Sequence, residues 1–227
     1  MTDPRFSPEA HSTWKRLFEG QREAIKKDIH PLFSQGLESL GITAERIPEL
    51  SDVNVRLREK TGFTGKYVDG LKEAVDFFPM LARGEFPVGN FIRDAKDLAY
   101  TPAPDVFHDL FGHLPYLADP DYADFTRRFG ALASRHENSP DTMKEFDRLY
   151  WFILEFGLIR HEGRAKVFGS GIASSHAETL YALSPEPEVL PFNLEQVRTQ
   201  DFRIDVMQKR LFIFESLPEL YGCLNGI

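Results

Sequence analysis

The chain has 227 residues, of which 42% are hydrophobic and 27% are charged, the proportions of an ordinary folded protein. The formal net charge of −8 argues against nucleic acid as a partner, and the single cysteine, Cys223, excludes a disulfide framework within the chain. Because the chain has no run of about 18 apolar residues and no secretory signal, we expect a cytoplasmic protein without a membrane partner.

Hydrophobic periodicity predicts a mostly helical chain. From Pro8 to Phe33 apolar residues recur at three- and four-residue steps, which predicts an amphipathic helix that Pro31 ends or kinks. Further helices are predicted, in chain order, at residues 44–60, 71–82, 105–114, 121–136, 141–160 and 174–183. Strands are predicted within residues 61–68, 86–91, 202–204 and 210–214, and a proline-rich surface loop at 184–191. The predicted fold is mainly α with small peripheral β-strands, in a single domain over residues 1–227.

Two histidines, His108 and His113, lie five residues apart in a predicted helix. On an ideal α-helix this spacing separates side chains by about 140°, against about 40° for a four-residue spacing. The imidazoles can therefore converge only if the helix ends or distorts between them, as Gly112 and Pro115 would allow. Metal binding would explain such convergence, and two unrelated histidines at a helix end are the alternative.

A single charge, Glu155, stands within the apolar run Leu149–Ile159. A buried carboxylate needs a partner, which is either a metal ion or a buried arginine. Two histidines and one carboxylate together form the ligand set of mononuclear non-haem iron(II) enzymes. Asp105, three residues before His108, is placed to accept the other ring N–H of that histidine.

Around these residues the chain resembles the pterin-dependent aromatic amino acid hydroxylases, above all the bacterial members that act on phenylalanine. The likeness rests on residues 86–88 with Arg93, 100–115, 150–158 and 169–175, in unbroken order. It implies the catalytic fold of that family, with a metal site of His108, His113 and Glu155. It also implies Fe(II), a tetrahydropterin (tetrahydrobiopterin or a bacterial analogue) and O₂ as a co-substrate.

The resemblance further implies which residues bind the substrate and the pterin. In the family, an arginine at the position of Arg93 binds the substrate carboxylate. The amino-acid pocket is implied to be lined by Thr101, Trp151, Phe156 and Ser174. The pterin site maps onto Val68, Gly70, Leu71, Phe77, Asp109 and Tyr150. Because the chain lacks the regulatory and tetramerisation segments of animal members, we expect a monomer.

The favoured hypothesis is therefore an iron(II)- and tetrahydropterin-dependent monooxygenase that hydroxylates the ring of an aromatic amino acid, with phenylalanine to tyrosine as the default reaction. One alternative is the same chemistry on tryptophan or another aromatic substrate. A second is a zinc hydrolase at the same three ligands, although no glutamate follows His108 to act as a general base. A third is a non-catalytic protein that binds a pterin or an amino acid.

Overall fold

The computed structural model describes residues 5–96, 98 and 104–227. Its α-helices are, in chain order, α1 (Pro8–Lys27), α2 (Pro31–Leu40), α3 (Leu50–Thr61), α4 (Ala74–Ala82), α5 (Leu114–Leu117), α6 (Pro120–Ser134), α7 (Pro140–Tyr150), α8 (Ser170–Ala173), α9 (His176–Ala182), α10 (Leu194–Thr199) and α11 (Leu217–Gly222). Two segments are π-helices, η1 (Phe107–His113) and η2 (Trp151–Glu155), and one is a 3₁₀-helix, η3 (Cys223–Gly226). Among the described helices, none has the length and apolar character needed to cross a bilayer.

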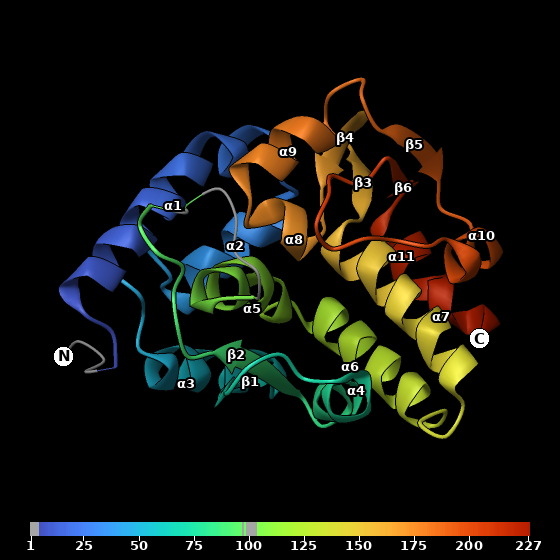
Figure 1. The fold of residues 1–227 in the computed structure, drawn as a ribbon, viewed down its shortest axis with the longest axis horizontal. Helices are drawn as coiled ribbons and strands as arrows, with labels where there is room; N and C mark the ends of the chain where they lie inside the picture. Colours follow the sequence, from blue (N-terminus) through green and yellow to red (C-terminus); the bar gives the residue numbers. More distant parts are fainter. Residues whose placement is uncertain (1–4, 97, 99–103) are drawn as a thin grey trace.

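The strands form two small sheets at the periphery of the helices (Figure 1). In one sheet, β1 (Thr64–Val68) and β2 (Glu85–Gly89) run parallel. The other has the order β4-β3-β6-β5, formed by β3 (Leu158–His161), β4 (Arg164–Val167), β5 (Glu188–Pro191) and β6 (Arg210–Phe214). Strand β3 is antiparallel to β4 and parallel to β6, and β5 is parallel to β6. The predicted class, mainly α with small peripheral strands, is confirmed.

The π-helix η1 lies between the N-terminal helices and the rest of the molecule. Helix α5, which follows η1, lies near the centre of the molecule (Figure 1). The Trp14 ring of α1 meets Phe107 at a centroid distance of 5.2 Å, and the Phe33 ring of α2 meets Phe111 at 5.1 Å. Phe107 and Phe111 stack on each other at 4.5 Å. One face of η1 is thus fixed by buried aromatic rings, which leaves its other face free to carry polar side chains.

The first predicted helix is in fact two helices. Helix α1 ends at Lys27, and Ile29 forms an isolated parallel bridge with Val167 at the end of β4. Pro31 occupies the first turn of α2, where its missing N–H costs nothing, and the His30 side chain accepts the N–H of Leu32 as the N-cap. Pro31 therefore begins a helix instead of ending one.

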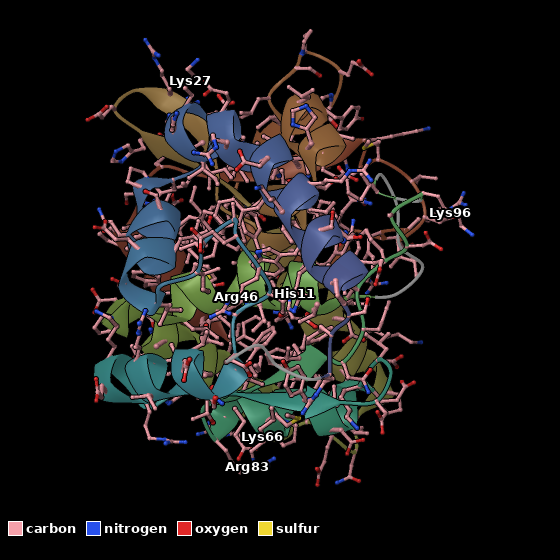
Figure 2. The ribbon with its side chains drawn as sticks, turned by 90° about the vertical axis from the view of Figure 1, so that its left-hand side faces the viewer. His11, Lys27, Arg46, Lys66, Arg83 and Lys96 are labelled. Atoms are coloured by element: carbon pink, nitrogen blue, oxygen red, sulfur yellow. The ribbon has the colours of Figure 1, made fainter. Side chains whose placement is uncertain are left out.

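Figure 2 looks onto α1, which crosses this face of the molecule with Lys27 at its far end and His11 near Arg46. The His11 Nδ1 accepts the N–H of Ile47 at 3.2 Å, which ties α1 to the segment before α3. Helix α3 begins at Leu50, and the prediction of a start at residue 44 was wrong. Pro48 is the physical reason, because a proline disfavours helical backbone at the residue that precedes it.

The long helix predicted over residues 141–160 ends at Glu155 instead. The Gly157 carbonyl accepts the N–H groups of both Phe168 and Gly169, and the next residues pair with neighbouring strands as β3. Sheet pairing over Leu158 and Ile159 thus outweighs helical periodicity, as it often does for buried apolar runs.

Two further predictions near the C-terminus were wrong. The predicted loop at 184–191 contains β5, whose edge position accommodates Pro191. Residues 202–204 form no strand, because a local ion pair between Arg203 and Asp205 at 2.6 Å closes a turn there. The Phe202 side chain points instead to the α7 and η2 region, where it stacks on Trp151.

Candidate metal centre

His108 and His113 lie one turn apart on η1, which is a π-helix and not an α-helix. The N–H of Leu114 donates to the carbonyl of Asp109, five residues earlier. This hydrogen-bond pattern brings residues five apart onto the same side, so both imidazoles face one point. Their Nε2 atoms are 3.0 Å apart. The expected distortion therefore spans the whole segment, and is not confined to Gly112 and Pro115.

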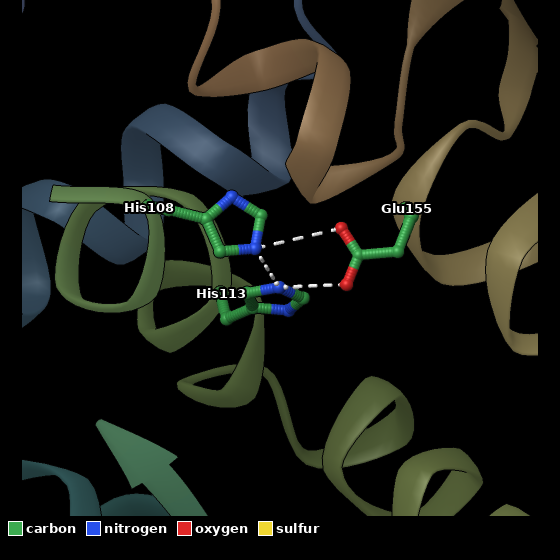
Figure 3. A group of neighbouring side chains, drawn as sticks. All are labelled: His108, His113 and Glu155. Carbon is green, nitrogen blue, oxygen red and sulfur yellow. Dashed lines mark hydrogen bonds and ion pairs between the residues drawn. The ribbon is translucent and has the colours of Figure 1, made fainter. Parts of the chain in front are cut away.

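Glu155 is the last residue of η2, a second π-helix, in which the N–H of Phe156 donates to the carbonyl of Trp151. Its Oε1 lies 3.0 Å from His113 Nε2 and its Oε2 lies 3.6 Å from His108 Nε2 (Figure 3). One ligand atom from each of the three residues falls within 4.8 Å of the others. Two π-turns from distant parts of the chain thus bring together the three residues predicted as ligands.

The site favours the deprotonated forms that metal ligation needs. Burial acts to raise the pKa of Glu155, but the two imidazoles and a hydrogen bond from the Tyr150 hydroxyl outweigh it and lower this pKa to about 2. Burial lowers the pKa of His108 to about 4 although Glu155 opposes the shift. At neutral pH the site therefore presents a carboxylate next to a neutral imidazole.

The ring orientation of His108 is set by Ser174. Its Nδ1 lies 3.0 Å from Ser174 Oγ, and that hydroxyl in turn donates to the carbonyl of Gly171 at 3.3 Å. Because the Ser174 hydroxyl donates its one proton to the Gly171 carbonyl, it accepts a hydrogen bond from His108 Nδ1–H. The imidazole proton is therefore on Nδ1, and Nε2 is unprotonated and faces Glu155. The prediction that Asp105 receives this ring N–H was wrong.

Asp105 instead pairs with Arg93 in a buried, bidentate arrangement. The Nε and Nη2 of Arg93 lie 2.8 and 2.9 Å from the two carboxylate oxygens. The same carboxylate accepts the backbone N–H of Arg93 at 2.9 Å and of His108 at 3.0 Å. Burial raises the pKa of Asp105, and the Arg93 guanidinium more than offsets it, so the net direction is downward. One carboxylate thus links the predicted substrate-binding arginine to the start of η1.

The predicted pocket residues Trp151 and Phe156 stack on each other at 4.4 Å, immediately beside Glu155. A third ring, Phe202, covers the other face of Trp151, also at 4.4 Å and with an interplanar angle of 13°. Sequence reasoning missed Phe202, because an isolated aromatic residue in a polar segment carries no signal of its distant partner. Thr101, the remaining predicted pocket residue, lies outside the described residues.

Two of the predicted pterin-site residues, Tyr150 and Asp109, lie near the metal ligands, and a third, Phe77, contacts Tyr150. The rings of Phe77 and Tyr150 are half-buried and meet edge to face at 5.0 Å. Tyr150 is also parallel to the His113 ring at 6.4 Å. The buried Asp109 carboxyl accepts the N–H of Gly89 at 2.7 Å, and burial raises its pKa to about 7.

The other three predicted pterin-site residues are further out. Val68 ends β1, and Gly70 has a left-handed backbone with φ of 65°. Leu71 leaves 73% of its surface exposed. These three residues form a rim near the end of β1, and no contact of theirs with the metal ligands is observed.

Two glycines lie against Glu155, a role that the sequence did not reveal beyond a turn. A Cβ on Gly169 would lie 2.1 Å from the Glu155 carbonyl oxygen, and one on Gly171 would lie 3.1 Å from its Oε2. A side chain at either position would therefore displace the carboxylate or its backbone. Paired glycines two residues apart, shortly after β4, were the available signal.

Two imidazoles and one carboxylate around a buried point, on a mainly α domain, are the arrangement of mononuclear non-haem iron enzymes. The sequence profile of the biopterin-dependent aromatic amino acid hydroxylases matches residues 3–224. The chain belongs to this family.

Among relatives, phenylalanine-4-hydroxylase of Vibrio cholerae is 37% identical over 93% of this chain and 73% of its own length. Human tyrosine 3-monooxygenase is 38% identical over 94% of this chain, but the match covers only 41% of that protein. Phenylalanine hydroxylase of Chromobacterium violaceum with bound iron(III) and 7,8-dihydrobiopterin superposes with a TM-score of 0.92 at 36% identity, covering 96% and 80% of the two chains. The iron- and phenylalanine-bound structure of that enzyme gives 0.90 at 34% identity, with the same coverage.

Proposed function

We propose that this chain is an iron- and tetrahydropterin-dependent monooxygenase that hydroxylates the ring of phenylalanine to give tyrosine. The observation that carries the proposal is the convergence of His108, His113 and Glu155 on one buried point. The substrate is supported by relatives named phenylalanine-4-hydroxylase and by the phenylalanine-bound structure of one similar enzyme. Tryptophan or another aromatic amino acid is the second candidate for the same chemistry.

The three side chains fit an iron(II) ion. Imidazole nitrogen and carboxylate oxygen suit this ion, and a two-histidine, one-carboxylate set leaves positions for other ligands. Glu155 is only 8% exposed and lacks a lysine or arginine partner among the described residues, so a cation at this point satisfies a buried charge. His108 and His113 would hold the metal through Nε2.

The surroundings of Tyr150 and Phe77 fit a reduced pterin, which is a flat ring system with N–H donors. Two half-buried aromatic faces offer stacking surfaces beside His113. The Asp109 carboxyl offers a hydrogen-bonding group within the same region, where it has the Gly89 N–H as a partner. We therefore assign Phe77, Tyr150 and Asp109 to the pterin, with Val68, Gly70 and Leu71 at the rim.

When bound, iron and the reduced pterin together activate O₂ and supply the oxidising power for ring hydroxylation. The protein supplies placement. Asp105 binds the Nε and Nη2 edge of the Arg93 guanidinium, and Nη1 donates to the Leu98 carbonyl at 3.4 Å, so the remaining N–H groups of Nη1 and Nη2 are the donors that we assign to the substrate carboxylate. The stacked rings of Trp151 and Phe156 exclude water from the region beside Glu155. The substrate ring is thereby held near the metal in an apolar surrounding.

The test is reconstitution with Fe(II) without air, followed by O₂, a tetrahydropterin and a panel of phenylalanine, tryptophan and tyrosine. We expect one oxygen atom added to phenylalanine, dependent on both iron and pterin. His113→Ala should lose bound iron and product, whereas His176→Ala, on the exposed start of α9, should keep both. Product from iron-free protein, or hydrolysis that zinc supports, would overturn the proposal.

We also propose that the chain acts as one domain and as a monomer in the cytoplasm, with neither nucleic acid nor membrane as a partner. A single cluster of buried apolar side chains, which runs from Phe6 to Leu224, supports the single domain. Light scattering on the purified chain tests the oligomeric state: a mass near 26.0 kDa is expected, and a multiple of it would contradict the proposal.

A further inference from the structure

Helix α8 is one turn long, and its C-cap is Ser174, the residue that orients His108. The last carbonyls of a helix have no partner within the helix. Here side chains from two other helices reach them: Gln21 Nε2 of α1 donates to the Ala173 carbonyl at 2.6 Å. Thr179 Oγ1 of α9 lies 2.9 Å from the Ile172 carbonyl and 3.0 Å from the Ser175 carbonyl. The Thr179 hydroxyl has one proton and donates to one of its two carbonyls at a time, so the Ala173 and Ile172 carbonyls before Ser174 are within reach of donors from outside α8.

Both of these polar side chains are buried. Gln21 and Thr179 are each 1% exposed, and Ala173 is fully buried. Gln21 Nε2 is also 3.5 Å from Thr179 Oγ1, so the two residues form one contact group. Burying a primary amide on α1 is costly, and here only its Nε2 donates a hydrogen bond, because Gln21 Oε1 is buried without a partner among the described residues. Packing alone would be served better by an apolar residue at position 21, as at Trp14 and Ala24 on the same helix.

We propose that Gln21 and Thr179 are positioning residues for the metal centre. They hold the turn at 172–175 so that Ser174 Oγ stays 3.0 Å from His108 Nδ1 and keeps Nε2 of that imidazole free for the metal. The inference rests on the proposed function, because it assumes that His108 is a ligand. It extends the support of the site to α1, where Gln21 lies 87 residues before His108 in the sequence.

The physical consequence follows from the Ala173 carbonyl. Without Gln21 this carbonyl is buried with no donor, and the turn gains by moving toward another donor or water. Ser174 is the next residue and moves with it, so the imidazole of His108 loses its fixed orientation. Loss of an outer partner of a ligand histidine lowers metal affinity roughly 10–100-fold. Because Gln21 and Thr179 act through Ser174, we expect a smaller effect, about three- to tenfold.

The experiment uses the full chain and Co(II), whose binding is followed by its visible absorption and by competition with a chelator. Gln21→Met keeps the length of the side chain and removes the donor, and Thr179→Val keeps the shape and removes the hydroxyl. Both variants should weaken Co(II) binding about three- to tenfold, which is less than the loss expected when a direct hydrogen-bond partner of a ligand histidine is removed. Thr179→Ser keeps the hydroxyl and should bind Co(II) as the unmodified chain does. If Gln21→Met fails to fold, as judged by circular dichroism, the comparison of Thr179→Val with Thr179→Ser tests the inference.

A double-mutant cycle separates positioning from general loss of stability. Ser174→Ala alone should weaken Co(II) binding, and adding Gln21→Met to it should cause no further loss, because the path runs through Ser174. An equal loss in both backgrounds, or unchanged affinity in folded Gln21→Met and Thr179→Val, would overturn the inference. If the unmodified chain itself binds no Co(II), the proposed function fails first, and this result is distinct from the other two.

Discussion

At the scale of single residues, three acidic side chains buried around the metal centre are each matched to a different task. Glu155 faces two imidazoles, Asp105 faces a guanidinium, and Asp109 has a backbone N–H as its partner. The partner decides the direction of the pKa shift: it is lowered for Glu155 and Asp105, and raised for Asp109. Burial is the largest influence on all three carboxyls and raises their pKa; hydrogen bonds and charges of the partners outweigh it for Glu155 and Asp105 but not for Asp109.

Replacing Asp105 by asparagine should therefore damage both stability and substrate binding. The change leaves the Arg93 guanidinium buried with no anion, and breaking a buried pair in this way costs about 3 kcal/mol or more. We expect the free energy of unfolding in urea to fall by about that amount, and KM for phenylalanine to rise, because Arg93 is no longer fixed.

Asp94→Asn is the matched control, since Asp94 pairs with Lys96 at the surface at 3.5 Å. Exposed pairs contribute roughly 0–1 kcal/mol, so this variant should unfold and turn over much as the unmodified chain does. Equal losses in the two variants would show that the Arg93–Asp105 pair has no special role.

At the scale of elements, both segments that carry the metal ligands are π-helices. This π-helical conformation is the feature that could not be predicted from the sequence. The five-residue spacing of His108 and His113 showed that an ideal α-helix could not serve, and the apolar run around Glu155 showed that a partner was required. The widened turns themselves could not be predicted, because their stability comes from tertiary contacts such as Phe107 on Trp14 and Glu155 on its imidazoles. Helices such as α6 were predicted nearly to their ends, whereas the two longest predicted helices, over 8–33 and 141–160, were too long because each contains a break that strand pairing fixes.

The variant Gly171→Ala should change the stability of α8 and the geometry of the metal centre in opposite directions. Alanine favours helix by up to about 1 kcal/mol over glycine, which by itself would stabilise α8. Its methyl group would lie 3.1 Å from Glu155 Oε2, so we expect the carboxylate to shift and Fe(II) affinity to fall about tenfold or more. Metal titration with chelator competition measures the affinity.

Gly20→Ala in α1 is the control, because a Cβ there meets nothing within 4 Å. It should raise the thermal midpoint slightly and leave Fe(II) affinity unchanged. If Gly171→Ala behaves as Gly20→Ala does, the close approach of Gly171 to Glu155 has no bearing on metal binding.

Phe202→Ala should loosen the proposed pocket wall from its outer side. Phe202 stacks on Trp151, and such a ring pair contributes roughly 0.5–1.5 kcal/mol beyond its buried area. We expect KM for phenylalanine to rise by up to about tenfold, with a smaller change in kcat, since the metal ligands are untouched.

The comparison is Phe192→Ala, which removes a similar stack, on Phe214 at 4.2 Å, at the end of strands β5 and β6. That variant should lose stability but keep its KM. A KM that stays constant in Phe202→Ala would show that Trp151 holds its position without the third ring.

At the scale of the whole molecule, the segment between α1 and α2 joins the N-terminal helices to the larger sheet. The His30 N–H donates to the Val167 carbonyl of β4 at 2.9 Å, while the His30 side chain caps α2. The ring lies edge-on to His161 at 4.8 Å and to Phe168 at 5.7 Å. A change at this one residue therefore acts on α2 and on the hairpin of β3 and β4, which lie far apart in the sequence.

Burial lowers the pKa of His30 from 6.5 to about 4, and the nearby His161 and Lys166 act in the same direction. Between these two pH values the unfolded chain binds a proton that the folded chain does not, so the contribution of neutral His30 to stability is complete above pH 6.5 and is lost as the pH falls toward 4. His30→Asn keeps a side chain that can cap α2 and removes this titration. The free energy of unfolding of the unmodified chain, minus that of His30→Asn, should therefore decrease steadily from pH 7 to pH 4 in urea denaturation. Carboxylates that titrate in the same range cancel in this difference, so a difference that is independent of pH would show that the pKa of His30 is the same in the folded and unfolded chains.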